Sequence, residues 1–150
     1  MSPLLDPFRP LLGRWEGTGL GEYPTINDFA YTETITLAPL ADKPVIQYTS
    51  TTKHADDGRP LHAETGYLRV IGEAMVELVV AQAPGLIEAG SGVATHPGGA
   101  DDRHAVRLAI DSTVVAGAPT AKEVTATERR YLVTGDRLTY GFAMAAVGVP

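Results

Sequence analysis

Glycine and proline recur along this 150-residue chain, and their spacing constrains the fold more than any other feature. The 16 Gly and 11 Pro residues are spread through the sequence, where they separate segments of strand length. Because both residue types are unfavourable inside helices and common in turns, this rhythm is typical of an all-β domain. The one helix that the sequence predicts is a short turn around Leu4 to Leu12, where Pro3, Pro7 and Pro10 limit it to about one or two turns.

Between these turns, period-two side-chain patterns and β-branched residues predict about nine strands. The two strands that flank Thr134-Gly135-Asp136 form the clearest hairpin. In one domain, such strands with short connections predict a meander that closes into an antiparallel barrel or packs as a sandwich. A barrel of this size can hold one small ligand inside or at its mouth. The predicted strands are Trp15–Gly21, Phe29–Leu37, Val45–Thr52, Glu64–Ile71, Met75–Ala81, Leu86–Thr95, His104–Val115, Glu123–Val133 and Arg137–Val147.

The composition excludes several kinds of site and partner. The absence of Cys removes disulfides, thiolate zinc sites, iron–sulfur clusters and cysteine nucleophiles. The formal net charge is −6 and the chain has no basic run, so we expect no nucleic-acid partner. No apolar run approaches the roughly 20 residues of a membrane span, and the first residues lack the features of a secretory signal. We therefore expect no membrane partner and a cytoplasmic location.

Glycine occupies alternate positions of the first predicted strand. With Gly13, Gly17, Gly19 and Gly21 on one face, that face carries almost no side chain apart from Trp15. Glycine in a strand usually marks a sharp bend or a close approach by a ligand or another backbone. Two interpretations stay open: the glycines permit the tight coiling of a barrel that Trp15 closes at one end, or a flat group rests against the smooth glycine face.

Few residues point to chemistry by their spacing alone. The chain has neither a G-x-S-x-G elbow nor a phosphate-binding glycine motif, so the sequence gives no support to a hydrolase or a nucleotide-binding protein. The histidines lack the spacing of a metal-binding pair. They are His54, His62, His96 and His104. His62 shares a strand face with Glu64, whose carboxylate could orient the imidazole, although a plain strand-end histidine explains the pair as well. Lys122 opens a strand, either as an exposed charge or as an anchor for an anionic ligand group.

One set of motifs resembles a known family. The spacing Gly13-x-Trp15-x-Gly17-x-Gly19, with Tyr23-Pro24-Thr25-Ile26 after it, resembles the G-x-W-x-G-x-G signature of the nitrobindin family, and of its actinobacterial members in particular. Further blocks similar to the family follow in the family order. They are His62-x-Glu64-x-Gly66-Tyr67-Leu68-Arg69, Ala118 to Thr125, and Leu138 to Pro150.

This resemblance implies a single barrel domain over residues 1–150, with ten antiparallel strands as in a fatty-acid-binding protein and heme b in a wide cleft at one end. It implies a ferric iron that binds nitric oxide reversibly and isomerises peroxynitrite to nitrate, so no protein residue is expected to be catalytic. By family position, Thr25 and His62 would lie near the heme pocket and Met144 close to the iron. Lys122 would contact the heme or its propionates.

The resemblance also has a departure at the end of the sequence. In the family, V-G-x-P is followed by L-x-x-H-L, whose histidine is the axial iron ligand, whereas this sequence stops at Pro150. We expect the axial histidine and most or all of the tenth, closing strand to lie beyond Pro150, because losing that strand would leave an unpaired edge along an apolar barrel. The alternative is a heme-free barrel that binds a fatty acid or another small apolar ligand. A homodimer is the usual default for a small assembly.

Overall fold

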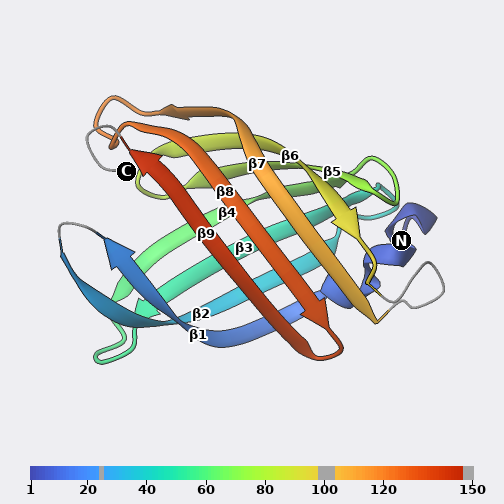
Figure 1. Ribbon diagram of the computed structural model, residues 1–150, viewed down its shortest axis with the longest axis horizontal. Helices are drawn as coiled ribbons and strands as arrows, with labels where there is room; N and C mark the ends of the chain where they lie inside the picture. Colours follow the sequence, from blue (N-terminus) through green and yellow to red (C-terminus); the bar gives the residue numbers. More distant parts are fainter. Residues whose placement is uncertain (24–25, 98–103, 147–150) are drawn as a thin grey trace.

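Nine strands in sequence order make up one antiparallel sheet, which curls into a nearly closed barrel (Figure 1). The structure is a computed structural model that describes residues 1–23, 26–97 and 104–146. A 3₁₀ helix, η1, precedes the sheet. The elements are η1 (Pro3–Leu11), β1 (Gly13–Tyr23), β2 (Ile26–Pro39), β3 (Val45–His54), β4 (Pro60–Val70), β5 (Met75–Gln82), β6 (Leu86–Thr95), β7 (Ala105–Gly117), β8 (Val124–Thr134) and β9 (Arg137–Ala146).

The meander and the barrel confirm the interpretation of the sequence, since each strand pairs with the next one along the chain. The turn between β8 and β9 lies at Gly135, which has a positive φ of 59°. Several strands extend beyond their predicted bounds, most clearly β2 and β4, because the ladder continues through polar residues that break the apolar alternation. The short helix is 3₁₀ over nine residues, with Pro7 and Pro10 inside it. No helix in the described ranges is long and apolar enough to cross a membrane.

Antiparallel pairing places alternate connections at opposite ends of the barrel. Strands β1, β3, β5, β7 and β9 begin at one end, beside η1, where β2, β4, β6 and β8 terminate, and the other ends of the strands lie at the opposite end. We call the first the η1 end. In Figure 1 it lies to the right, beside the N-terminus, and the opposite end lies to the left.

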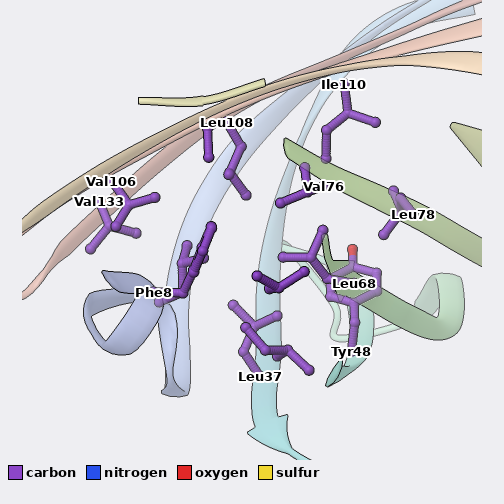
Figure 2. Close-up of a cluster of buried hydrophobic side chains, with 14 of the residues drawn as sticks. Phe8, Leu37, Tyr48, Leu68, Val76, Leu78, Val106, Leu108, Ile110 and Val133 are labelled. Carbon is purple, nitrogen blue, oxygen red and sulfur yellow. The ribbon is translucent and has the colours of Figure 1, made fainter. Parts of the chain in front are cut away.

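The apolar core fills the η1 end. Leu5, Phe8 and Leu11 of η1 are fully buried there, and Figure 2 shows Phe8 within a cluster of side chains from the surrounding strands. Each such side chain stabilises the fold by about 1.5–3 kcal/mol relative to an exposed one. The strands contribute Leu37, Ile46, Tyr48, Leu68, Val70, Val76, Leu78, Val106, Leu108, Ile110 and Val133, among others. The helix thus closes this end of the barrel with buried side chains.

Strands β1 and β9 are the two edges of the sheet. No backbone ladder joins them in the part of the chain that the structure describes. Instead, the Tyr140 hydroxyl on β9 donates to the carboxylate of Glu33 on β2. It also lies 3.1 Å from the hydroxyl of Tyr31, which is on β2 as well. Side chains therefore connect the two margins of the sheet on the inside of the barrel.

Candidate functional site

A buried ion network crosses the barrel above the apolar core. The guanidinium of Arg129 on β8 lies between Glu64 on β4 and Glu88 on β6, and its side chain is only 2% exposed. Its Nη2 lies 2.7 Å from Glu64 Oε2 and also donates to Glu88 Oε1. Nη1 donates to Glu64 and to the Tyr131 hydroxyl, and Nε donates to Glu88. All five N–H groups of Arg129 are used within the protein, so none is left for an anionic ligand.

The electrostatics of this network favour the charged forms of Glu88 and Arg129. Burial alone would raise the pKa of Glu88, but hydrogen bonds and the charge of Arg129, with help from Thr127 and Gln82, hold that pKa below its ordinary value. Burial also disfavours the charge of Arg129, yet its interactions with Tyr131 and Glu64 raise its pKa above the ordinary value. Two carboxylates around one guanidinium therefore form a charged layer between the apolar core and the opposite end of the barrel.

A second polar cluster lies beside this layer, on the side of the barrel where the two edges of the sheet approach each other. Glu33 accepts hydrogen bonds from Ser50 on β3 and from Tyr140 on β9. Burial, followed by the hydrogen bonds to Glu33 and Tyr31, raises the pKa of Tyr140 far above its ordinary value. The phenol therefore stays neutral and can donate at any physiological pH.

Beyond the charged layer, the interior of the barrel opens to solvent. Phe142 is paired with Arg129 across β8 and β9, and its ring centre lies 4.5 Å from the guanidinium carbon, so the ring faces inward. It is nevertheless 38% exposed. On β1, a Cβ added at Gly17 would meet no atom within 4 Å. We call this region, defined by Gly17, His62, Phe142 and Met144, the mouth.

His62 and Met144, both expected near a ligand, lie at the mouth. His62 is half-buried near the start of β4, on the same inward face as Glu64, and opposes Thr52 of β3. Met144 is half-buried near the end of β9, opposite the buried Thr127. The fold therefore brings these two residues to one end, although 82 positions separate them in the sequence.

Lys122 lies at the same end of the barrel but outside its interior. It is exposed in the connection between β7 and β8, where the Ala118 N–H donates to the Gly85 carbonyl at 2.8 Å. Within the described ranges Lys122 has no ion-pair partner. Thr25, the fourth residue expected near the ligand, lies outside the described residues.

The glycine motif of β1 divides into three parts. Gly13 and Trp15 lie toward the η1 end, where the Trp15 indole N–H donates to the Leu11 carbonyl at 2.9 Å and the ring packs against the core. Gly17 faces open space at the mouth. A Cβ at Gly19 would overlap the Tyr31 ring. The flat group over Gly19 is therefore a ring of this chain, whereas no atom lies within 4 Å of a Cβ added at Gly17 or at Gly13.

The sequence suggested that Glu64 could orient the imidazole of His62, and the structure assigns Glu64 differently. Both oxygens of this carboxylate bind Arg129, and one also accepts from the Tyr48 hydroxyl at 3.1 Å. A buried guanidinium competes better for a carboxylate than a half-exposed imidazole does, because its charge must be compensated inside the barrel. His62 itself has no hydrogen-bond partner among the described residues.

The other histidines lie elsewhere or are already engaged. His54, near the mouth, accepts from the Asp56 backbone N–H at Nδ1 and stacks on Phe29 with ring centres 6.1 Å apart. His96 lies at the η1 end, with its ring 5.7 Å from that of Phe8, and the backbone carbonyl of His104 accepts from Gly135 in the β8–β9 turn there. The described residues contain no group of three or more His, Asp or Glu that could hold a metal ion.

Neither Phe142 nor Arg129 was among the site residues that the sequence predicted. Phe142 lies two positions before Met144, so the strand period would have placed it on the same inward face. Arg129 and Glu88 were detectable as charged residues at inward positions of their strands. Their pairing was not detectable, because 41 positions separate them in the chain.

Comparisons with known proteins agree with this geometry. Residues 4–150 match the family model described as "THAP4-like, heme-binding beta-barrel domain". The chain is 45% identical over 150 residues to peroxynitrite isomerase 2 of Mycobacterium ulcerans, covering 100% of this chain and 89% of that protein. It is 44% identical to peroxynitrite isomerase 1 of Mycobacterium tuberculosis H37Rv, covering 100% and 90%. The crystal structure of Rv2717c from M. tuberculosis superposes with a TM-score of 0.91 at 42% identity, covering 100% of this chain and 91% of that one.

Proposed function

Since the chain belongs to the family of THAP4-like, heme-binding β-barrel domains, we propose that it binds ferric heme b at the mouth and isomerises peroxynitrite to nitrate. Full-length relatives named peroxynitrite isomerase support the reaction. The observation that carries the placement is Phe142, an inward apolar ring that is 38% exposed at the end of the barrel opposite η1. An apolar ring that faces inward and yet meets solvent marks a space that a ligand can fill.

The residues of the mouth fit a heme by their chemistry. Phe142 and Met144 offer apolar surface to a flat macrocycle, and Gly17 leaves free the space that a Cβ would fill. His62 adds an imidazole without a hydrogen-bond partner in the described part of the chain. Lys122 adds a positive charge at the same end, suited to a propionate. Bound heme supplies iron chemistry for the isomerisation, so the protein needs no nucleophile of its own.

The chain's own residues would bind and orient rather than react. The layer of Arg129, Glu64 and Glu88 separates the mouth from the apolar core, and its guanidinium has no N–H left to bind an anion. We assign His62 and Thr25 to the part of the pocket where peroxynitrite or nitric oxide would reach the heme. His54, His96 and His104 would not hold the iron, because His96 and His104 lie at the η1 end and His54 is engaged by its own loop.

The direct test of the proposed function is to add hemin to the purified protein and record the absorption spectrum. We expect a Soret band of bound ferric heme, and a stopped-flow assay should then show heme-dependent decay of peroxynitrite that yields nitrate. The His62→Ala variant should change ligand kinetics more than heme retention. Absence of a Soret band would contradict the proposal, and loss of heme in His62→Ala would make His62 the ligand instead.

The second candidate is a heme-free barrel that carries a fatty acid or another small apolar ligand. The same exposed Phe142 favours it, since an apolar ring at an open mouth suits an alkyl chain as well as a macrocycle. Native mass spectrometry of the purified protein distinguishes the two: a bound lipid and no uptake of hemin would favour this candidate.

Three further parts of the proposal have separate tests. Reversible binding of nitric oxide should appear as a shift of the Soret band that reverses when the gas is removed. A homodimer, the usual default for a small assembly, should appear in light scattering as twice the mass of the 15.8 kDa chain. A cytoplasmic location should appear on cell fractionation.

A further inference from the structure

We propose that Tyr31, Glu33 and Tyr140 are positioning residues: they form a hydrogen-bonded clasp that ties β9 to β2 across β1 and thereby sets the distance between the two walls of the mouth. We call these three residues the clasp. That the ligand between the walls is heme rests on the proposed function; the clasp itself rests on the contacts described next.

Each side chain of the clasp has a hydrogen-bond partner inside the barrel. Tyr140 donates its hydroxyl proton to Glu33 Oε1, and the hydroxyl of Tyr31 lies 3.1 Å from that of Tyr140. Ser50 donates to the other carboxylate oxygen, Glu33 Oε2. On its other side, the ring of Tyr140 stacks on that of Tyr131, with ring centres 5.7 Å apart and planes inclined by 25°. Tyr140 is therefore fixed both by hydrogen bonds to β2 and by packing against β8.

Gly19 explains how a side chain of β2 reaches β9 although β1 lies between them. Tyr31 is paired with Gly19, and its ring occupies the position that a Cβ at Gly19 would take. Any other residue at position 19 would push this ring away and separate its hydroxyl from Tyr140. The third glycine of the motif thus provides the space for the Tyr31 ring of the clasp. Glu33, the other clasp residue on β2, is paired with Gly17, where an added Cβ would meet no atom within 4 Å.

The clasp matters for the ligand because of what lies on the same two walls. On β9, Tyr140, Phe142 and Met144 are successive inward residues, so the placement of Tyr140 fixes the other two. On β1, Gly17 lies two positions before Gly19 on the glycine face. No backbone ladder joins β1 to β9 in the described residues, so these hydroxyl and carboxylate contacts are the polar link seen between the two margins of the sheet. Loss of the link should let the walls move apart and loosen the hold on a flat ligand.

The test compares Tyr140→Phe with Tyr67→Phe. The first variant keeps the ring and removes the hydroxyl that makes both hydrogen bonds. The second removes a hydroxyl from an outward-facing ring on β4 that is 42% exposed and has no hydrogen bond in the described part of the chain. Hydrogen exchange of the heme-free proteins reports on the margins of the sheet, and transfer of hemin to excess apomyoglobin reports on the mouth.

In Tyr140→Phe we expect faster hydrogen exchange in β1 and β9 and unchanged hydrogen exchange in β4 to β6. The Soret band of bound hemin should shift. Release of hemin should be about tenfold faster, which corresponds to a loss of roughly 1.4 kcal/mol of binding free energy. Tyr67→Phe should match the wild type in all three measurements. A lower melting temperature with wild-type exchange, Soret band and hemin release would overturn the proposal, because it would show a merely structural role.

A milder variant keeps the proposal testable if Tyr140→Phe fails to fold. Tyr31→Phe removes one hydrogen bond and leaves the bond from Tyr140 to Glu33, so release of hemin should be about two- to threefold faster. Unchanged exchange and release in Tyr31→Phe would then overturn the proposal. If the wild type takes up no hemin, the proposed function fails while the exchange measurement still decides whether the clasp ties the margins together.

Discussion

The two ends of this barrel are built from the same nine strands, yet they treat inward side chains in opposite ways. At the η1 end, Phe8 is an inward ring with no exposed surface, packed in a cluster with buried side chains of the strands (Figure 2). At the mouth, Phe142 is an inward ring of the same kind with more than a third of its surface in solvent. The charged layer of Arg129, Glu64 and Glu88 lies between them. The fold thus places its stability at one end and leaves the other end free for a ligand.

The difference between the two ends is tested most strongly by making the same substitution, phenylalanine to alanine, at each of them. Phe8→Ala should lower the free energy of unfolding of the heme-free protein by about 4 kcal/mol, because it removes buried apolar surface and leaves a cavity. Phe142→Ala should cost only about 1 kcal/mol, mainly its contact with Arg129, while it weakens the binding of hemin. Urea unfolding measures the first effect and a hemin titration the second. Equal losses of stability would contradict the division into a core end and a ligand end.

The next largest effect concerns the charged layer. Arg129→Met should cost about 3 kcal/mol or more, because it leaves the buried carboxylates of Glu64 and Glu88 without a counter-charge. Arg130→Met is the matched control: the neighbouring arginine is half exposed and pairs with Asp111 at 2.9 Å on the outside of the barrel. Its loss should cost at most about 1 kcal/mol. Similar losses for the two arginines would show that the layer does not depend on its buried charge.

Two glycines of one motif sharpen the comparison within a single strand. Gly19→Ala should cost about 2 kcal/mol, because its Cβ would overlap the Tyr31 ring. Gly17→Ala should leave the free energy of unfolding within about 0.5 kcal/mol of the wild type, since its Cβ meets open space and the backbone has no positive φ there. It should still weaken the binding of hemin. A destabilised Gly17→Ala would place Gly17 in the packed part of the barrel.

The smallest effect is the dependence of stability on pH. Interactions with Arg129 hold the pKa of Glu88 below its ordinary value of 4.5 in the folded protein. A carboxylate with a lowered pKa contributes stability that is present above pH 4.5 and is lost as the pH falls through its folded pKa. Glu88→Gln should therefore flatten the loss of stability below pH 4.5, measured by urea unfolding at several pH values. An unchanged acid slope would assign that loss to other carboxylates.

Local sequence patterns predicted much of the fold but few of the polar contacts inside the barrel. The turn at Gly135 and the alternation along β3 and β5 were visible in the sequence because turns and strand faces depend on neighbouring residues. The partner of a side chain across the barrel depends on register and closure, which no local pattern contains. For this reason the sequence offered only His62, two positions away, as a candidate partner of Glu64 and left a plain strand-end histidine open, whereas the structure pairs Glu64 with Arg129, 65 positions away.

The glycine face of β1 is a second example of a feature that the sequence alone could not resolve. The sequence left open whether the glycines served coiling or a flat group, and the pairing of β1 with β2 shows that a ring of this chain occupies the space at Gly19. The Tyr31 ring occupies the position of a Cβ at Gly19, while a Cβ at Gly17 would meet open space. That distinction required the register, because only the pairing tells which ring lies over which glycine.

The central claim is that the ligand binds at the mouth and not at the η1 end. Its most direct test is an amide NMR spectrum of the isotopically labelled protein with ferric hemin, compared with the same protein loaded with the diamagnetic gallium porphyrin. We predict that the paramagnetic iron broadens the amide signals of Gly17, His62, Phe142 and Met144 and leaves those of Phe8 and Val106 sharp. Selective broadening around Phe8, or no selective broadening at all, would contradict the account.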